Sequence, residues 1–220
     1  MRAKVFVFDA YGTLFDVHAA VRRHTGAVGP DAAALSDLWR SKQLEYTWVR
    51  SLMRVHRDFA QVTADALDYA LARFSSVDKR LRAALLESYR TLDAYPDVPA
   101  VLAGLKRAGA RLAILSNGTH DMLKAAVASA GIGANLDAVL SIDDAGVFKT
   151  DPRVYQLALD RLGAKANDVS FQSSNRWDIA GAVAFGFRAV WINRACAPDE
   201  YPDLKPAAII PTLAELANVA

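Results

Sequence analysis

The chain has 220 residues, of which 53% are hydrophobic and 23% charged, which is ordinary for one globular domain or a domain with an insertion. A formal net charge of +2 gives no reason to expect nucleic acid or an anionic membrane as a partner. The single cysteine, Cys196, excludes an intramolecular disulfide framework. We recognise neither a signal-peptide pattern nor an apolar segment of membrane-spanning length, so we expect a cytoplasmic protein.

The first predicted element is a buried strand at residues 4–8, which opens into the stretch VFVFDAYGTLFDV. It lacks polar alternation, as expected when both faces of a sheet are covered. The strand ends in Asp9, and Thr13 follows after a turn. A carboxylate at the end of a buried strand is a candidate nucleophile.

Residues 16–93 break this pattern, because they carry helical periodicity without a convincing strand. We predict a helical insertion there, which ends before Pro96. One helix, predicted over 39–59, has apolar residues spaced so that they share one face: Leu44, Trp48, Leu52, Val55 and Phe59.

Arg40 lies four residues before Leu44 and heads the same face. Two interpretations remain open: an end residue whose charged head reaches water, or an anion site that faces a cleft. The other basic residues of this helix predict a solvated face rather than a nucleic-acid surface, because they form no separate basic domain: Lys42, Arg50, Arg54 and Arg57.

After Pro96 the chain alternates between short apolar runs and Ala/Leu-rich helical stretches. This alternation predicts an α/β fold with a parallel sheet and helices on both of its faces. Residues 1–15 and 94–220 would form this core, with the helical insertion between them. The predicted strands are 111–115, 169–171 and 189–192, and the predicted helices are 98–108, 119–130, 152–162 and 178–185.

Polar residues follow three of the predicted strands. Each set alone is typical of a turn or a helix cap. In an open parallel sheet, however, ligands bind beyond the carboxyl ends of the strands, so three such sets together predict a site in one crevice. The sets are Asp9 with Thr13, Ser116-Asn117-Gly118, and Ser173-Ser174-Asn175 with Asp178.

Lys149, in VFKTDPRVY, is a candidate counter-charge for this crevice. A surface lysine is the simpler interpretation. A buried aspartate, however, would be protonated by desolvation unless a cation lay within a few ångströms. Tyr155 follows in the same predicted helix start, where its hydroxyl could reach the same region.

The motifs FDAYGT, WRSKQLEYTW, LSNG, FKTDPRVY and SSNRWDIAGA together resemble the L-2-haloacid dehalogenases of the haloacid dehalogenase superfamily. The motifs run from residue 8 to about residue 194. The resemblance implies a Rossmann-like core with a helical cap inserted after the first strand, and a homodimer. Three departures leave pocket shape and substrate range open: Gln172, Thr150 and Ser41.

The resemblance implies that Asp9 is the nucleophile, with Thr13 and Lys149 holding its carboxylate. Arg40 and Asn117 would receive the departing halide. The hydrolytic half of the site would consist of Ser173, Asn175 and Asp178, with Tyr155 supporting Lys149.

The substrate would lie between a polar and an apolar side. By the same resemblance, Ser116 and backbone amides near Ala10, Tyr11 and Asn117 would hold its carboxylate. Its α-carbon would face an apolar wall made by Tyr11, Leu44, Phe59 and Trp177.

The implied reaction converts short (S)-2-haloalkanoic acids to (R)-2-hydroxy acids through an aspartyl ester on Asp9. Its partners are the halocarboxylate and halide, with no cofactor, metal, nucleic acid or membrane. A metal-dependent phosphatase on the same fold is the alternative, but it needs a second Asp at the position of Tyr11. A non-catalytic protein that binds a small carboxylate is the third hypothesis.

Overall fold

The computed structural model describes residues 4–219, and its centre is a six-stranded parallel sheet in the order β3-β2-β1-β4-β5-β6. The predicted α/β class is therefore confirmed. Four strands match the prediction from sequence, whereas β3 and β6 have no counterpart in it. The strands are β1 (Val5–Phe8), β2 (Arg111–Ser116), β3 (Ala138–Ser141), β4 (Val169–Ser173), β5 (Arg188–Ile192) and β6 (Ala208–Ile210).

The strand order reverses direction between β1 and β4, which are paired in parallel from Val5 with Val169 to Phe8 with Gln172. Such a switch point leaves a crevice beyond the carboxyl ends of the two strands. Asp9 follows β1 directly, and Ser173 is the last residue of β4. The topology thus brings two of the predicted polar sets together.

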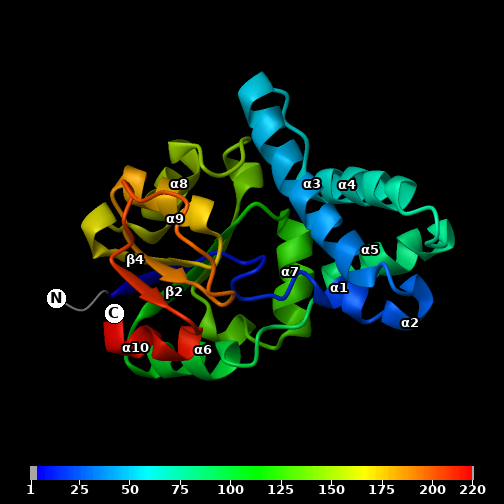
Figure 1. Ribbon diagram of the computed structural model, residues 1–220. Helices are drawn as coiled ribbons and strands as arrows, with labels where there is room; N and C mark the ends of the chain where they lie inside the picture. The colour runs from blue at the N-terminus through cyan, green and yellow to red at the C-terminus, as the bar shows by residue number, and fades with distance from the viewer. Residues whose placement is uncertain (1–3, 220) are drawn as a thin grey trace.

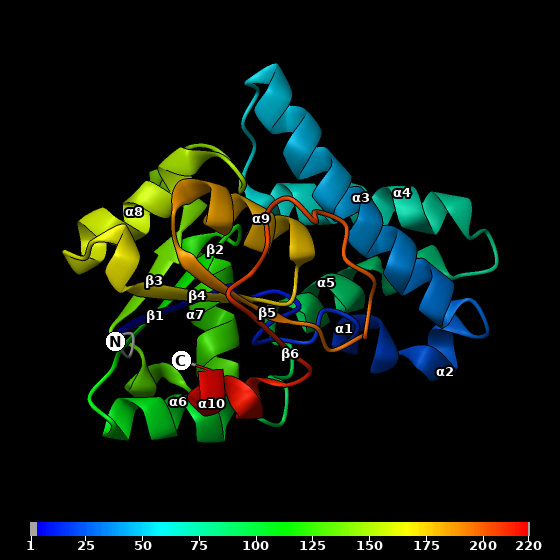
Figure 2. The ribbon, with the colours of Figure 1, turned by 60° about the vertical axis from the view of Figure 1, so that its left-hand side comes forward.

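Helices cover both faces of the sheet. Figure 2 shows α8 and α9 on one side of the strands and α6 and α10 on the other. Thr119 caps α7 and Asp151 caps α8, each accepting a hydrogen bond from a backbone N–H in the first turn. The bounds are α6 (Val98–Arg107), α7 (His120–Ser129), α8 (Pro152–Leu162), α9 (Arg176–Phe185) and α10 (Leu216–Val219).

The chain forms further helices between β1 and β2, and they gather to one side of the sheet (Figure 1). Helix α10 lies at the opposite side. These helices are α1 (Ala19–Arg22), α2 (Thr25–Val28), α3 (Ala32–Met53), α4 (Phe59–Arg73) and α5 (Arg82–Arg90). Short 3-10 helices occupy Lys79–Leu81, Gly133–Asn135, Ile142–Asp144, Ala166–Asp168 and Leu213–Glu215.

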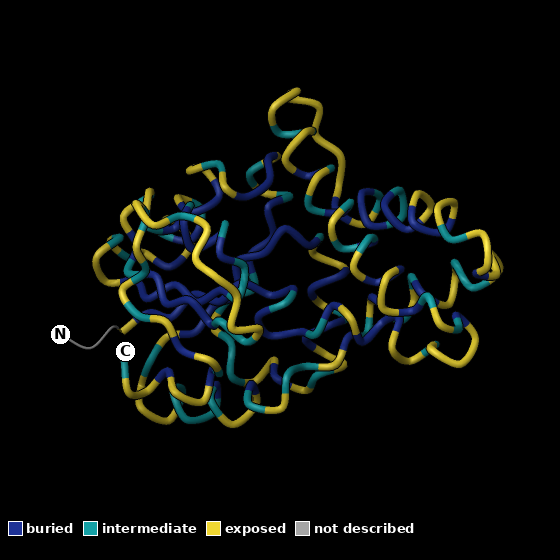
Figure 3. Tube along the Cα trace, viewed as in Figure 1, coloured by how far each residue is buried: buried dark blue, intermediate teal, exposed yellow. Residues whose placement is uncertain are grey.

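The prediction of one helix over 39–59 is correct up to Met53 and wrong beyond it. Helix α3 ends at Met53, where Arg54 adopts a left-handed conformation and caps it, and Asp58 begins α4 by accepting a hydrogen bond from Gln61 N. Leu52 is 84% exposed at the tip of α3, which Figure 3 draws as exposed. The apolar periodicity therefore continues across a turn into another helix.

Phe59 is nevertheless buried, because it opens α4 against the core. The tip of α3 projects beyond the other helices in Figure 1. Among residues 4–219, no helix is both long and apolar enough to cross a membrane.

Candidate active site

Asp9 is held by donors from three parts of the chain. Its backbone N–H donates to Gln172 O at 2.9 Å, which ties the end of β1 to β4. Its Oδ2 accepts hydrogen bonds from Thr13 Oγ1 at 2.9 Å, Asn175 Nδ2 at 2.8 Å and, more weakly, Ser173 Oγ at 3.4 Å. The side chain is only 6% exposed, and these hydrogen bonds fix its orientation.

The ammonium of Lys149 lies between two carboxylates. Its Nζ is 3.0 Å from Asp9 Oδ1 and 2.8 Å from Asp178 Oδ2, and the lysine and Asp178 side chains are both fully buried. Burial opposes the charge of Lys149, but attraction to Asp178 and Asp9 outweighs it and raises the pKa of the ammonium. The lysine therefore remains a cation, as a counter-charge for the crevice must.

Asp178 has the environment of a proton acceptor. Burial, together with repulsion from Asp9, raises its pKa to about 6 against the opposing effect of Lys149. Tyr155 Oη donates to Asp178 Oδ1 at 2.9 Å. Burial and the neighbouring Asp178 raise the pKa of Tyr155, so this hydroxyl keeps its proton. A carboxylate with a pKa near neutrality can take a proton from water under physiological conditions.

Arg40 reaches the same crevice from α3. Its Nη2 donates to Tyr11 O and to Asn175 Oδ1, both at 3.3 Å. Asn175 in turn donates to Asp9 Oδ2, so one side chain separates the guanidinium from the carboxylate. Of the two interpretations open from the sequence, the structure favours a cation that faces the crevice over one that only reaches water.

Ser116 and Asn117 shape the end of β2. Ser116 Oγ accepts a hydrogen bond from Gly118 N at 3.1 Å, and Asn117 Oδ1 accepts one from Lys149 N at 3.0 Å. Asn117 therefore positions the segment that carries the lysine. Both side chains are buried at the same sheet edge as Asp9.

Aromatic rings form an apolar wall beside Asp9. The Tyr11 ring lies 5.6 Å from the Phe59 ring and 5.5 Å from the Tyr89 ring, measured between centroids. Burial and Tyr89 raise the pKa of Tyr11 well above its usual value, and its hydroxyl is buried without a hydrogen-bond partner among the described residues. Gly118 packs so closely that an added Cβ would lie 2.6 Å from Tyr11 Cε2.

Three further residues predicted to contact the substrate are Ala10, through its backbone amide, and Leu44 and Trp177, through their side chains. Ala10 is fully buried, and Leu44 is half-buried on α3, one turn after Arg40. Trp177, in the first turn of α9, packs edge-on against Trp48 at 5.6 Å between ring centroids. Both tryptophans line a cavity of about 640 Å³ that lies between α3 and α9.

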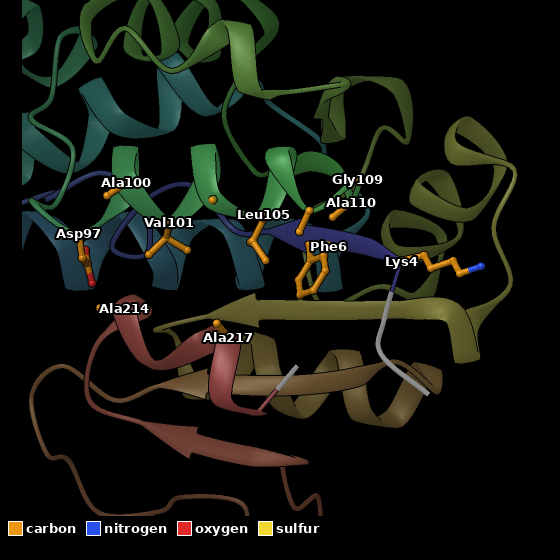
Figure 4. A pocket seen from close by; sticks show the side chains of 12 residues that line it. Lys4, Phe6, Asp97, Ala100, Val101, Leu105, Gly109, Ala110, Ala214 and Ala217 are labelled. Carbon is orange, nitrogen blue, oxygen red and sulfur yellow. The ribbon is translucent and has the colours of Figure 1, made fainter.

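A second cavity lies away from these residues. It has a volume of about 690 Å³ and lies between β1, α6 and the C-terminal helix (Figure 4). Phe6, Val101, Leu105, Ala214 and Ala217 are among the residues that line it. It lies between the sheet and α6, and none of the predicted site residues lines it within residues 4–219.

The donor set of the crevice does not fit a divalent cation. The position of a second carboxylate after β1 is occupied by the buried ring of Tyr11. The ammonium of Lys149 already lies between Asp9 and Asp178. Within residues 4–219, His, Cys, Asp and Glu form no group of three or more suited to hold a metal ion. Mg²⁺ takes several oxygen ligands, and the two carboxylates that could supply them here are already paired with Lys149.

Sequence reasoning missed a set of buried polar residues behind Arg40. Gln43 Oε1 accepts a hydrogen bond from Arg40 Nη1 at 3.2 Å and another from Tyr89 Oη at 3.1 Å. Gln43 Nε2 donates to Thr63 Oγ1 at 2.7 Å. The sequence could have indicated the contact between Gln43 and Arg40, because the two residues are three apart on a helix. It could not have indicated the contacts with Thr63 and Tyr89.

The three residues that depart from the pattern of the L-2-haloacid dehalogenases lie in different surroundings. Gln172 is fully buried, donates to Ser170 Oγ at 2.6 Å and keeps its own Oε1 without a partner among the described residues. Thr150 approaches Gly181, where an added Cβ would meet it at 2.8 Å. Ser41 is exposed on α3.

A family model described as haloacid dehalogenase-like hydrolase matches residues 3–186. The chain is 51% identical over 196 residues to (S)-2-haloacid dehalogenase 4A of Burkholderia cepacia, covering 89% of this chain and 85% of that protein. It is 50% identical to (S)-2-haloacid dehalogenase 1 of Pseudomonas sp. strain CBS-3, covering 89% and 86%. Among solved structures it is similar to L-2-haloacid dehalogenase from Xanthobacter autotrophicus with chloropropionic acid covalently bound, with a TM-score of 0.90, 36% identity and coverage of 99% and 98%. The chain therefore belongs to the haloacid dehalogenase-like hydrolases.

Proposed function

We propose that this protein is an (S)-2-haloacid dehalogenase that hydrolyses short 2-haloalkanoic acids to (R)-2-hydroxy acids. The observation that carries the proposal is the buried Asp9–Lys149–Asp178 arrangement with an arginine on its open side and Tyr11 in place of a second acid. The similarity to (S)-2-haloacid dehalogenases supports the same reaction.

In the first step, an Asp9 carboxylate oxygen attacks the α-carbon of the substrate from the side opposite the halogen. A carbon–oxygen bond forms, the carbon–halogen bond breaks, and the electron pair leaves with the halide. Arg40 and Asn117 receive this halide. Because negative charge develops on the halogen only as the bond breaks, a fixed cation stabilises the transition state more than the ground state.

In the second step, water attacks the ester carbonyl carbon of Asp9. Asp178 takes one proton from that water while the oxygen adds to the carbonyl carbon. The bond between this carbon and the ester oxygen then breaks, and the proton left on the added hydroxyl passes to the departing alkoxide, which gives the 2-hydroxy acid and the Asp9 carboxylate. Asp178 afterwards releases its proton to water. Ser173 and Asn175, which contact Asp9 Oδ2, position the ester. This step does not touch the α-carbon, so the single displacement of the first step sets an inverted product.

Substrate orientation follows from three different walls. Ser116 and backbone amides near Ala10, Tyr11 and Asn117 hold the carboxylate. The alkyl group faces Tyr11, Leu44, Phe59 and Trp177, and the halogen faces Arg40. We propose that residues 16–93 act as a cap over a core formed by residues 1–15 and 94–220, because Arg40 and Asp9 come from different sides of the crevice.

The phosphatase alternative needs an acid to protonate the leaving alcohol, and a cation to offset the phosphate. A halide leaves without a proton, and a halocarboxylate brings a single charge. Tyr11 therefore suits the halide reaction, in which a second carboxylate would only repel the substrate.

The direct test is halide release from (S)-2-chloropropionate, with and without excess EDTA. We expect chloride release that EDTA leaves unchanged, (R)-lactate as the product, little turnover of the (R)-enantiomer, and no phosphatase activity with Mg²⁺. A phosphate ester that is the better substrate would favour the phosphatase. Binding of 2-chloropropionate without chloride release would favour the non-catalytic carboxylate-binding protein.

We further propose that the protein works in the cytoplasm as a homodimer. The exposed apolar residues near the tip of α3, which include Val49, Leu52 and Met53, support self-association. Light scattering during size-exclusion chromatography should give twice the chain mass of 23.8 kDa, and a single-chain mass would contradict the dimer.

A further inference from the structure

We infer that Gln43 is a positioning residue that fixes the guanidinium of Arg40 while leaving its full charge available to the departing halide. The inference rests on the proposed function. Gln43 is fully buried on α3, and its Oε1 accepts a hydrogen bond from Arg40 Nη1 at 3.2 Å.

The amide of Gln43 is held from both sides. Its Oε1 faces Arg40, because a guanidinium can only donate, and its Nε2 donates to Thr63 Oγ1 at 2.7 Å, on α4. Tyr89, on α5, donates to the same oxygen at 3.1 Å. Three helices therefore define the position of one acceptor, and a rotated amide would bring two donors together at Arg40.

The network continues toward the nucleophile. Arg40 Nη2 donates to Tyr11 O and Asn175 Oδ1, and Asn175 Nδ2 donates to Asp9 Oδ2. Arg40 is thus held from behind by Gln43 and in front by Tyr11 O and by Asn175, which also contacts Asp9. Three of its five N–H donors are used in these contacts, which leaves donors for a halide.

The chemistry of the acceptor matters as much as its place. An amide oxygen is neutral, so it orients the guanidinium without offsetting its charge. A carboxylate at the same point would hold the arginine equally well but would neutralise it. The substitution Gln43→Glu therefore adds a carboxylate that offsets the charge of Arg40, with little change of shape. Gln43→Met instead removes the acceptor and keeps an unbranched side chain of similar length.

The test compares kcat/KM for (S)-2-chloropropionate and (S)-2-bromopropionate in the wild type and both variants. With Arg40 misplaced or neutralised, more charge on the leaving group is left unstabilised, so the poorer leaving group suffers more. We expect kcat/KM for the chloro compound to fall by about tenfold or more. We expect the bromo/chloro ratio of kcat/KM to rise clearly above that of the wild type. A purely structural role would lower the fraction of active enzyme and leave this ratio unchanged.

Gln61→Met is the matched control, because Gln61 lies half-buried on α4 and bonds Asp65 rather than the crevice. Its ratio should equal that of the wild type. Bromide binding, measured as a rise in the thermal midpoint, gives a second reading that needs no turnover and shows that each variant is folded. Bromide should raise the midpoint of the wild type more than that of Gln43→Glu.

An unchanged bromo/chloro ratio in either folded variant would overturn the inference while leaving the proposed function intact. A wild type that releases no halide from either substrate would instead overturn the proposed function. The role of Gln43 would then be judged by bromide binding alone, and equal midpoint rises in the wild type and in Gln43→Glu would overturn it.

Discussion

Replacing Lys149 with methionine removes the buried cation that lies between Asp9 and Asp178. Methionine keeps the apolar stem and approximate volume, so the change is mainly one of charge. The ammonium is 3.0 Å from one carboxylate and 2.8 Å from the other, and its side chain is 0% exposed. Two buried carboxylates would then face each other without compensation.

The size of the effect follows from these distances. At an effective dielectric constant near 20, each contact contributes about 5–6 kcal/mol of attraction. Desolvation of the ammonium offsets part of this, and removal of one partner from a buried ion pair typically costs about 3–5 kcal/mol. We therefore expect the free energy of unfolding of Lys149→Met to be about 3–5 kcal/mol lower at pH 8.

The deficit should depend on pH in a defined direction. Burial and Asp9 already raise the pKa of Asp178 to about 6, and loss of the lysine raises it further. A folded-state pKa above the unfolded value means that the folded protein binds the proton more tightly. The variant therefore regains stability as pH falls, and its deficit should be smaller at pH 5 than at pH 8. The wild-type lysine stays charged throughout, because its pKa is raised.

Urea unfolding at pH 5 and pH 8 measures both quantities. Lys106→Met is the control, since Lys106 pairs with Asp137 on the surface with 37% of its side chain exposed. Its cost should stay below about 1 kcal/mol at either pH. A Lys149→Met deficit below about 1 kcal/mol, or one that is equal at both pH values, would refute the electrostatic account of the site.

Three further predictions concern the reaction and the apolar wall beside Asp9. Arg40→Ala should lower the rate of chloride release by a factor on the order of 100 or more, and Arg40→Lys should not restore it fully. Near-normal activity of Arg40→Ala would mean that Arg40 only extends its charged head into water. The pH profile of kcat should show one acid limb with an apparent pKa near 6 from Asp178, coupled to its neighbours, and a flat profile from pH 7 to pH 5 would contradict its role as the base. Gly118→Ala should force the buried ring of Tyr11 to shift, lower stability by about 1–3 kcal/mol and raise KM; a normal thermal midpoint and a normal KM would show that the ring has room.

The central part of the fold was predictable because its strands are buried on both faces. Runs such as 4–8 and 111–115 have no alternation and end in polar residues, which is what a covered parallel sheet requires. Strands β3 and β6 escaped prediction because they are short and lie at the sheet edges, where Ala138 and Ile209 are partly exposed. The end of α3 escaped it because apolar spacing continues through the turn at Arg54.

The charged part of the candidate site was predictable for a different reason. Asp9 follows a strand, Asp178 lies in the first turn of a helix and Lys149 shortly precedes one, and a parallel sheet brings such positions to one edge. Gln43 escaped prediction, because its helical spacing from Arg40 suggests one contact and does not reveal the partners on other helices. Its partners come from two other helices, whose packing no local pattern in the sequence reveals.

The central claim is that Asp9 forms a covalent ester that water then cleaves at the enzyme's own carbonyl carbon. A single turnover in water enriched in heavy oxygen, with enzyme in excess over (S)-2-chloropropionate, tests this directly. Mass spectrometry of the peptide that contains Asp9 should find the label in that carboxylate and not in the lactate. Label that appears first in the lactate hydroxyl would mean direct attack of water on the substrate and would contradict the account.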